Sequence, residues 1–471
     1  MSQPTKLSVH ADKHPSRPAR LPLAWVIVAA VIVATFYPGI MSNDSIASLE
    51  QARTLEFTSW HPPIMAIIWS VLDRIVEGPV LMLAVQAALY AIAAAKLCTE
   101  AFPGLVRKFT PWLVIPLFSL FPPVMTLNGM IWKDVWMSAL LLLALAYLFR
   151  MARADSSKSR LHAFFVVLTG CLFATAFRHN AVAATAGLLA GAFYFMWPDL
   201  RPWLRLLRAC VCGVLLAIGL MLLVSTLVRL VAQPAHVTTP ILMHDIAGMI
   251  VNSKEPWRAA RVALAVSPAL SDTSPHEFTQ AIKRRYTPAA AGQILRTSRR
   301  PDAPFAINVY RLDHDADAVK QAWLALIKEE PAAYLTHRAK AFACLLQLCD
   351  RREWAQHSYI LNPRYVAPEG NGPMQGTLRT LLVRPGTAWM YSPAFWLALV
   401  LAGGAYGLAR PRERPLLVFM GLSGLGLAVS LFFTSPIESY RYMHWVVVMG
   451  WTMAWLLLGR LLQPNQAASP D

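Results

Sequence analysis

The sequence is short of charge. Only 15% of its 471 residues are Asp, Glu, Lys or Arg, whereas a soluble domain carries about a quarter. Hydrophobic residues make up 56% of the chain, and the mean hydropathy is +0.44. This composition argues against a soluble enzyme and against a disordered chain, and it predicts a polytopic membrane protein.

Cysteine is also scarce, because six residues in a chain of this length do not make a disulfide framework. Four of them fall in or beside apolar runs, where a small soft side chain simply packs. Cys344 and Cys349 lie in the one long polar region. A continuous helix would point them in different directions, so a disulfide there needs a break in the helix. No CxxC motif or His/Cys cluster indicates a structural metal site.

Apolar runs of membrane-spanning length occur ten times. They lie near residues 21–40, 79–98, 110–127, 131–149, 161–178, 181–198, 209–232, 389–409, 415–434 and 443–461. We therefore predict an all-α, polytopic integral membrane protein with about ten transmembrane helices. Its first outer loop would carry interfacial helices, and a small helical periplasmic cap would complete the fold.

Basic residues set the predicted orientation. Lys and Arg gather in the loops that ten spans would place on the side of both termini, and the opposite short loops are nearly free of such clusters. They are Arg107, Lys108, Arg150, Arg153, Lys158, Arg160, Arg201, Arg205, Arg208, Arg410, Arg412, Arg414 and Arg460. The positive-inside rule then places both termini in the cytoplasm. The net charge of +17 is explained by topology before it indicates a nucleic-acid partner.

The predicted organisation has five parts. They are a basic cytoplasmic tail (1–20), an N-terminal transmembrane module of about seven spans (21–232, first outer loop 41–78), a large outer region (233–388), a C-terminal module of about three spans (389–461) and a cytoplasmic tail (462–471). The outer region is rich in proline, so we expect it to bury no large core of its own. Compact loops and the lack of a targeting signal favour a bacterial inner membrane.

Polar side chains gather at the outer ends of the predicted spans, beginning with Asp44. This residue follows the first span in the sequence Asn-Asp-Ser. All three residue types are good helix N-caps. A carboxylate at the mouth of a lipid-walled cleft can also serve as a general base. The sequence leaves both interpretations open.

The same loop contains the sequence Trp60-His61-Pro62-Pro63. Proline favours the first turn of a helix, and the residue before a proline is extended, so this segment predicts the start of a second helix. That helix is too short to span the bilayer and should lie in its interface. His61 would then lie at the membrane surface, either as a simple hydrogen-bonding group or as a contact to a substrate.

Two short hairpins and the start of the last span add further charge. Lys133 and Asp134 begin one span, where the helix dipole favours Asp134 but disfavours Lys133, which indicates a compensating anion. Arg178 and His179 lie in the next hairpin, and Arg441 precedes the last span. A guanidinium can hold a phosphate through two hydrogen bonds, or it can reach toward lipid head groups.

This pattern resembles the GT-C superfamily of polytopic glycosyltransferases, which use polyprenyl-phosphate-linked sugars. The resemblance rests on Asp44 in the first loop, on the His-Pro-Pro-Ile segment at 61–64, on the long outer region, and on Arg441 and Tyr442 before the last span. The segment at 61–64 is similar to the Lys-Pro-Pro-Leu type of the protein-mannosyltransferase and aminoarabinose-transferase branch. The resemblance covers mainly residues 20–200 and the last hundred.

The resemblance implies inverting transfer of a sugar to a lipid or glycan acceptor. Asp44 would be the catalytic residue that deprotonates or orients the acceptor hydroxyl. Basic residues would hold the phosphate leaving group. The implied substrate-binding residues are His61, Lys133, Asp134, Arg178, His179 and Arg441. The chain lacks the adjacent acidic pair of that branch, and it has His61 at the position where that branch has a lysine. We therefore predict no metal and no cofactor besides the donor lipid.

Two other classes remain open. A polysaccharide polymerase or ligase would use an arginine of the large outer region, and Arg338 and Arg364, together with Asp245, are its candidates. A lipid or solute transporter would carry out no covalent chemistry and would tolerate Asp44→Asn. The expected partners are membrane lipid, a lipid-linked sugar donor and a lipid or glycan acceptor, with no nucleic acid.

Overall fold

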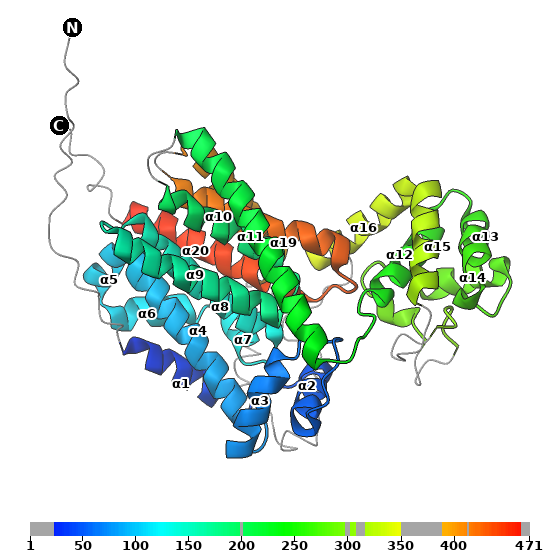
Figure 1. Ribbon diagram of the computed structural model, residues 1–471, viewed down its shortest axis with the longest axis horizontal. Coiled ribbons are helices and arrows are strands. Elements are labelled where there is room, and N and C mark those ends of the chain that lie inside the picture. Colours follow the sequence, from blue (N-terminus) through cyan, green and yellow to red (C-terminus); the bar gives the residue numbers. More distant parts are fainter. Residues whose placement is uncertain are drawn as a thin grey trace, which may run out of the picture.

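The computed structural model describes residues 23–197, 201–296, 302–307, 316–349, 389–411 and 414–462. Within these ranges every regular element is a helix, and extended segments pair only in three isolated bridges. The predicted all-α class is confirmed. Figure 1 shows a bundle of long helices and, beside it, a smaller unit formed by α12 to α16.

Six helices are long and apolar enough to cross a membrane. They are α4 (Val80–Ala101), α8 (Lys133–Ala152), α9 (Ser157–Phe177), α11 (Pro202–Val231), α19 (Pro415–Thr434) and α20 (His444–Leu461), the last together with the preceding short helix η4 (Tyr440–Met443). The chain is therefore a multi-pass helical membrane protein.

Five further helices correspond to the four remaining predicted spans. The run near 110–127 folds as α6 (Pro111–Ser119) and α7 (Pro122–Asn128), which are bent by 75° and count as a seventh span only if taken together. The other three are apolar but shorter: α1 (Ala24–Phe36), α10 (Ala181–Met196) and α18 (Pro393–Ala409). The number of ten spans stays a prediction.

Helix α8 lies at the centre of the bundle. It is the most buried of the six long helices, and it packs against α4, α9 and α20.

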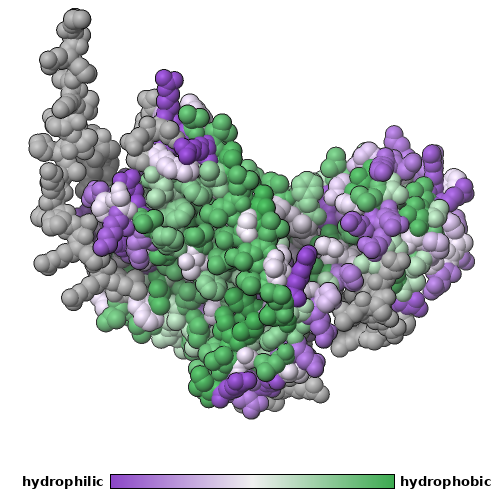
Figure 2. Space-filling view, in the orientation of Figure 1, coloured by the Kyte–Doolittle hydropathy of each residue, from purple (hydrophilic) through white to green (hydrophobic). Residues whose placement is uncertain are grey.

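Elsewhere in the bundle, small residues let helices approach closely. A Cβ atom at Gly187 of α10 would lie 2.4 Å from the Ser423 nitrogen of α19. Figure 2 shows hydrophobic surface over the middle of the bundle and hydrophilic residues toward its ends and over α12 to α16.

The second unit has a hydrophobic core of its own. Its helices are α12 (Thr239–Asn252), α13 (Pro256–Val266), α14 (Pro275–Arg285), α15 (Ala316–Glu329) and α16 (Pro331–Leu345). They surround a cluster that includes Met243, Ile250, Phe278, Phe305 and Leu326, all fully buried. The prediction that this region buries no large core of its own underestimated the core that forms. The amphipathic helices pack their apolar faces together despite the many prolines between them.

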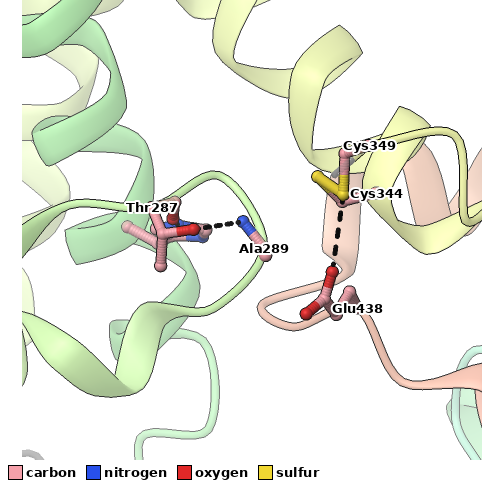
Figure 3. The surroundings of a disulfide bond; sticks show 6 residues. Thr287, Ala289, Cys344, Cys349 and Glu438 are labelled. Atoms are coloured by element: carbon pink, nitrogen blue, oxygen red, sulfur yellow. Dashed lines mark hydrogen bonds between the residues drawn. A yellow bond between two sulfur atoms is a disulfide. The ribbon is translucent and has the colours of Figure 1, made fainter. Parts of the chain in front are cut away.

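Two backbone hydrogen bonds join the second unit to the loop between α19 and η4. The Ala291 nitrogen donates to the Pro436 oxygen at 3.0 Å, and the Glu438 nitrogen donates to the Ala289 oxygen at 2.7 Å. Helix α16 ends at Leu345, and this break lets Cys344 and Cys349 form a disulfide with a Cα–Cα distance of 4.8 Å. Figure 3 shows the disulfide beside Glu438 of that loop.

Candidate active site

Six of the seven predicted site residues meet in one cluster. They come from five places in the sequence: the start of α2 (Asn43–Thr54), the segment before α3 (Ile64–Ile75), the start of α8, the turn after α9, and η4. Consecutive spans run in opposite directions, so the start of α8, the end of α9 and the start of α20 lie at one end of the bundle. The six residues are Asp44, His61, Lys133, Asp134, Arg178 and Arg441.

The first loop is fixed against the start of α8. The Ile40 nitrogen donates to the Gly129 oxygen and the Ile131 nitrogen donates to the Ile40 oxygen, both at 3.0 Å. The backbone reaches this position through Gly39, which has a φ of +119° and lies so close to Ile131 that a Cβ atom would meet its side chain at 2.8 Å. Only glycine fits such a turn without strain.

Asp44 does not cap its helix. Ser42 is the N-cap of α2 and forms a capping box with Ser45, while the Ser45 hydroxyl donates to the Ile131 oxygen at 2.7 Å. The Asp44 carboxylate is therefore available for the cluster, and its Oδ2 lies 2.7 Å from Nη2 of Arg441. The cap interpretation of Asp44 is therefore wrong, and its role as a site residue stays a prediction.

His61 lies between Lys133 and Asp44. The Lys133 ammonium donates to Nδ1 of His61, which leaves the ring proton on Nε2, and that nitrogen faces Asp44 Oδ1 at 3.7 Å. Burial and the positive charge of Lys133 lower the pKa of His61 to about 3. The imidazole is therefore neutral at physiological pH.

Asp134 holds two guanidinium groups in place. Its carboxylate accepts from Nη1 of Arg178 at 3.2 Å and lies 3.2 Å from Nε of the same residue, and it lies 4.0 Å from Nε of Arg441. The Tyr442 ring contacts both guanidiniums, with centroid distances of 4.6 Å and 5.2 Å. Asp134 is only 2% exposed, so its carboxylate faces the arginine side chains and not the solvent.

The cluster holds three basic side chains (Lys133, Arg178 and Arg441) and two carboxylates. His61 is neutral, so with Lys133 protonated the sum is one positive charge. Burial alone would raise the pKa of Asp44, but Arg441 and its other basic neighbours lower it far below the usual value. Asp44 is thus ionised. It is also the more accessible carboxylate, with 30% of its side chain exposed.

A small pocket lies among these side chains, and its walls include Asp44, Met65, Trp132, Lys133 and Arg441. While the side chains are paired, the pocket has no room for a water molecule. A phosphate group can therefore enter only when they separate.

The remaining candidates have other positions. His179 lies in the same turn as Arg178, and its buried Nε2 has no hydrogen-bond partner among the described residues. Burial and the nearby positive charges of Lys133 and Arg178 lower the pKa of His179. Arg364 lies outside the described residues. The sequence analysis did not identify Trp132, whose ring lies 4.8 Å from the Arg441 guanidinium. Its position next to Lys133 in the sequence could have indicated that it lies at the cluster.

Asp245 and Arg338 form a separate buried network in the second unit. The Arg338 guanidinium donates to Asp245 Oδ2 at 2.7 Å and to the Ser435 oxygen at 3.1 Å. His337 Nε2 lies 3.1 Å from Asp245 Oδ1, and Nδ1 of the same ring shares a hydrogen bond of 2.7 Å with the Tyr286 hydroxyl. Arg338 and Asp245 are each 1% exposed, so their charges neutralise each other inside the protein.

Comparison of the chain with protein-family models, with curated proteins and with solved structures found no match. Among the described residues, the one group of His, Cys, Asp and Glu side chains close enough to share a metal ion is Cys344, Cys349 and Glu438. It lies at the disulfide and not in the charged cluster.

Proposed function

We propose that this protein is a membrane glycosyltransferase that moves a sugar from a polyprenyl-phosphate donor to a hydroxyl group of a lipid or glycan acceptor. The reaction would take place at the outer face of a bacterial inner membrane, with both termini in the cytoplasm. One observation carries the proposal: three cations and one accessible carboxylate meet at a single end of the membrane-spanning bundle. The resemblance to the GT-C superfamily supports the same reaction class.

The cluster offers a partner for each charge that the reaction creates. The acceptor hydroxyl gives its proton to Asp44, its oxygen bonds to the anomeric carbon, and the bond from that carbon to the phosphate oxygen breaks with its electron pair leaving on the phosphate. Attack opposite to the leaving group inverts the anomeric centre. The donor phosphate carries one negative charge before transfer and two afterwards, while Asp44 goes from one to none.

The basic residues would bind the phosphate and stabilise its added charge. Arg178 and Arg441 are fixed by Asp134 and by the Tyr442 ring, so little reorganisation is needed when the charge grows. Lys133 adds a third positive charge, and His61 presents its Nε2 proton toward Asp44. We propose no metal ion in this mechanism.

No specific observation favours the polymerase class or the transporter class. Arg338, the candidate of the polymerase class, is buried and bonded to Asp245, so it offers no contact to a lipid pyrophosphate. Transporters place their ionisable groups near the middle of the bilayer on broken helices. The charged residues of the cluster lie instead at the start of α8, just after α9 and in η4.

The decisive experiment follows radiolabelled sugar from polyprenyl-phosphate donors into the lipid and polysaccharide fractions of membranes. Wild type is compared with Asp44→Asn at equal expression, and Asp73→Asn serves as the matched control. Asp73 is paired with Arg53, outside the cluster. We expect transfer by wild type and the control and a loss of at least about a hundredfold in Asp44→Asn. Transfer that survives Asp44→Asn would remove Asp44 from the mechanism, and no transfer from any donor would refute the proposal.

A further inference from the structure

In the structure, Asp44 occupies the place that a phosphate needs. Its Oδ2 lies 2.7 Å from Nη2 of Arg441, and Asp134 is the other carboxylate near that guanidinium. The pocket beside them has no room for a water molecule while Asp44 and Arg441 are paired. An anionic ligand therefore competes with Asp44 for Arg441.

We infer that the donor phosphate enters by exchange: it replaces Asp44 on Arg441, and the carboxylate released in this way becomes the base for the acceptor. The donor must then bind before the acceptor can react. This inference rests on the proposed function and adds an order of binding to it.

Asp44 and Arg441 differ in how freely their side chains can move, and this difference decides which of the two is displaced. The Arg441 guanidinium is 12% exposed and lies between the rings of Trp132 and Tyr442, with Asp134 behind it. The Asp44 side chain is 30% exposed and stands in the first turn of α2, where it can change rotamer without moving the helix. The arginine thus stays as the binding site, and the carboxylate leaves.

The exchange also changes the basicity of Asp44. A carboxylate bonded to a guanidinium gives up that bond when it takes a proton, so the pair makes a poor base. A phosphate on Arg441 neutralises the guanidinium and ends this stabilisation. Asp44 then remains beside His61, at the edge of the pocket where an acceptor hydroxyl would approach.

The test measures binding of a short-chain polyprenyl monophosphate to the purified full chain in detergent, by native mass spectrometry or calorimetry. This probe keeps the phosphate that stays on the lipid after transfer. Asp44→Asn removes the competing charge, so we expect about tenfold tighter binding. Arg441→Gln should bind at least tenfold more weakly than wild type, and Asp73→Asn should match wild type. Arg441→Lys, which keeps the charge but not the planar group, should fall between wild type and Arg441→Gln.

Each outcome has a distinct meaning. Binding that is unchanged or weaker in Asp44→Asn, with a wild type that binds, would overturn the exchange and leave the transferase proposal in place. A wild type and an Asp44→Asn variant that are folded and both fail to bind would overturn the exchange and the proposed function together. Equal displacement of the probe by phosphatidylglycerol would show a general site for lipid head groups, which also overturns the inference.

Discussion

Replacing Asp134 with Asn removes the carboxylate that two guanidinium groups share. Arg178 contacts it through two nitrogen atoms at 3.2 Å, and Arg441 approaches to 4.0 Å. Loss of one partner from a buried ion pair costs about 3–5 kcal/mol. Because the two arginines are 17% and 12% exposed, water relieves part of this cost, and we expect a loss of about 3 kcal/mol in the free energy of unfolding.

Equilibrium unfolding in mixed micelles measures this loss. Asp272→Asn is the matched control, because Asp272 is 78% exposed and pairs with Arg296 at 3.4 Å, and such exposed pairs contribute about 0–1 kcal/mol. A double-mutant cycle of Asp134→Asn with Arg178→Gln should give a coupling of at least about 1 kcal/mol. If Asp134→Asn costs no more than Asp272→Asn, the reasoning that Asp134 positions the arginines is wrong.

Two further predictions concern protonation and the disulfide. Burial and Lys133 lower the pKa of His61 to about 3, so between that value and about 6.5 the unfolded chain binds a proton that the folded chain does not. Acidification from pH 7 to pH 5 should therefore cost about 2 kcal/mol through His61, and His61→Gln should remove this part of the pH dependence in unfolding experiments. Cys344 and Cys349 should react with a thiol reagent only after reduction, as read by mass spectrometry. Reduction should lower the stability of the second unit by about 2 kcal/mol, the cost expected for so short a loop.

Hydropathy was a sufficient guide to the helices. Each of the ten apolar runs coincides with an apolar helix or, near 110–127, with the bent pair α6 and α7. A window average cannot detect that bend, because it depends on Pro122 and on packing against neighbouring helices. It also missed the core of the second unit, whose helices α13 to α15 bury one face each and are on average far less apolar than the long helices of the bundle.

The grouping of the candidate site could be predicted because the short loops on the predicted outer side carry few charges, so six ionisable side chains there stood out. Their individual roles could not. The choice of Ser42 rather than Asp44 as the helix cap depends on the backbone of the whole loop. The burial of Asp134 between two arginines depends on contacts between residues up to about 300 positions apart, which no local pattern contains.

The scattering of the site along the chain has a consequence for biosynthesis. Asp44 and Arg441 are separated by almost the whole protein, so at about 5–20 residues per second the ribosome needs roughly 20–80 s to supply the second after the first. Until then Lys133 and Arg178 only balance Asp44 and Asp134, and the cluster has no surplus charge for an anion. Under the proposed function, the nascent membrane protein is therefore unable to bind the donor phosphate until the segment that carries Arg441 has been made, and an interrupted chain would lack that group.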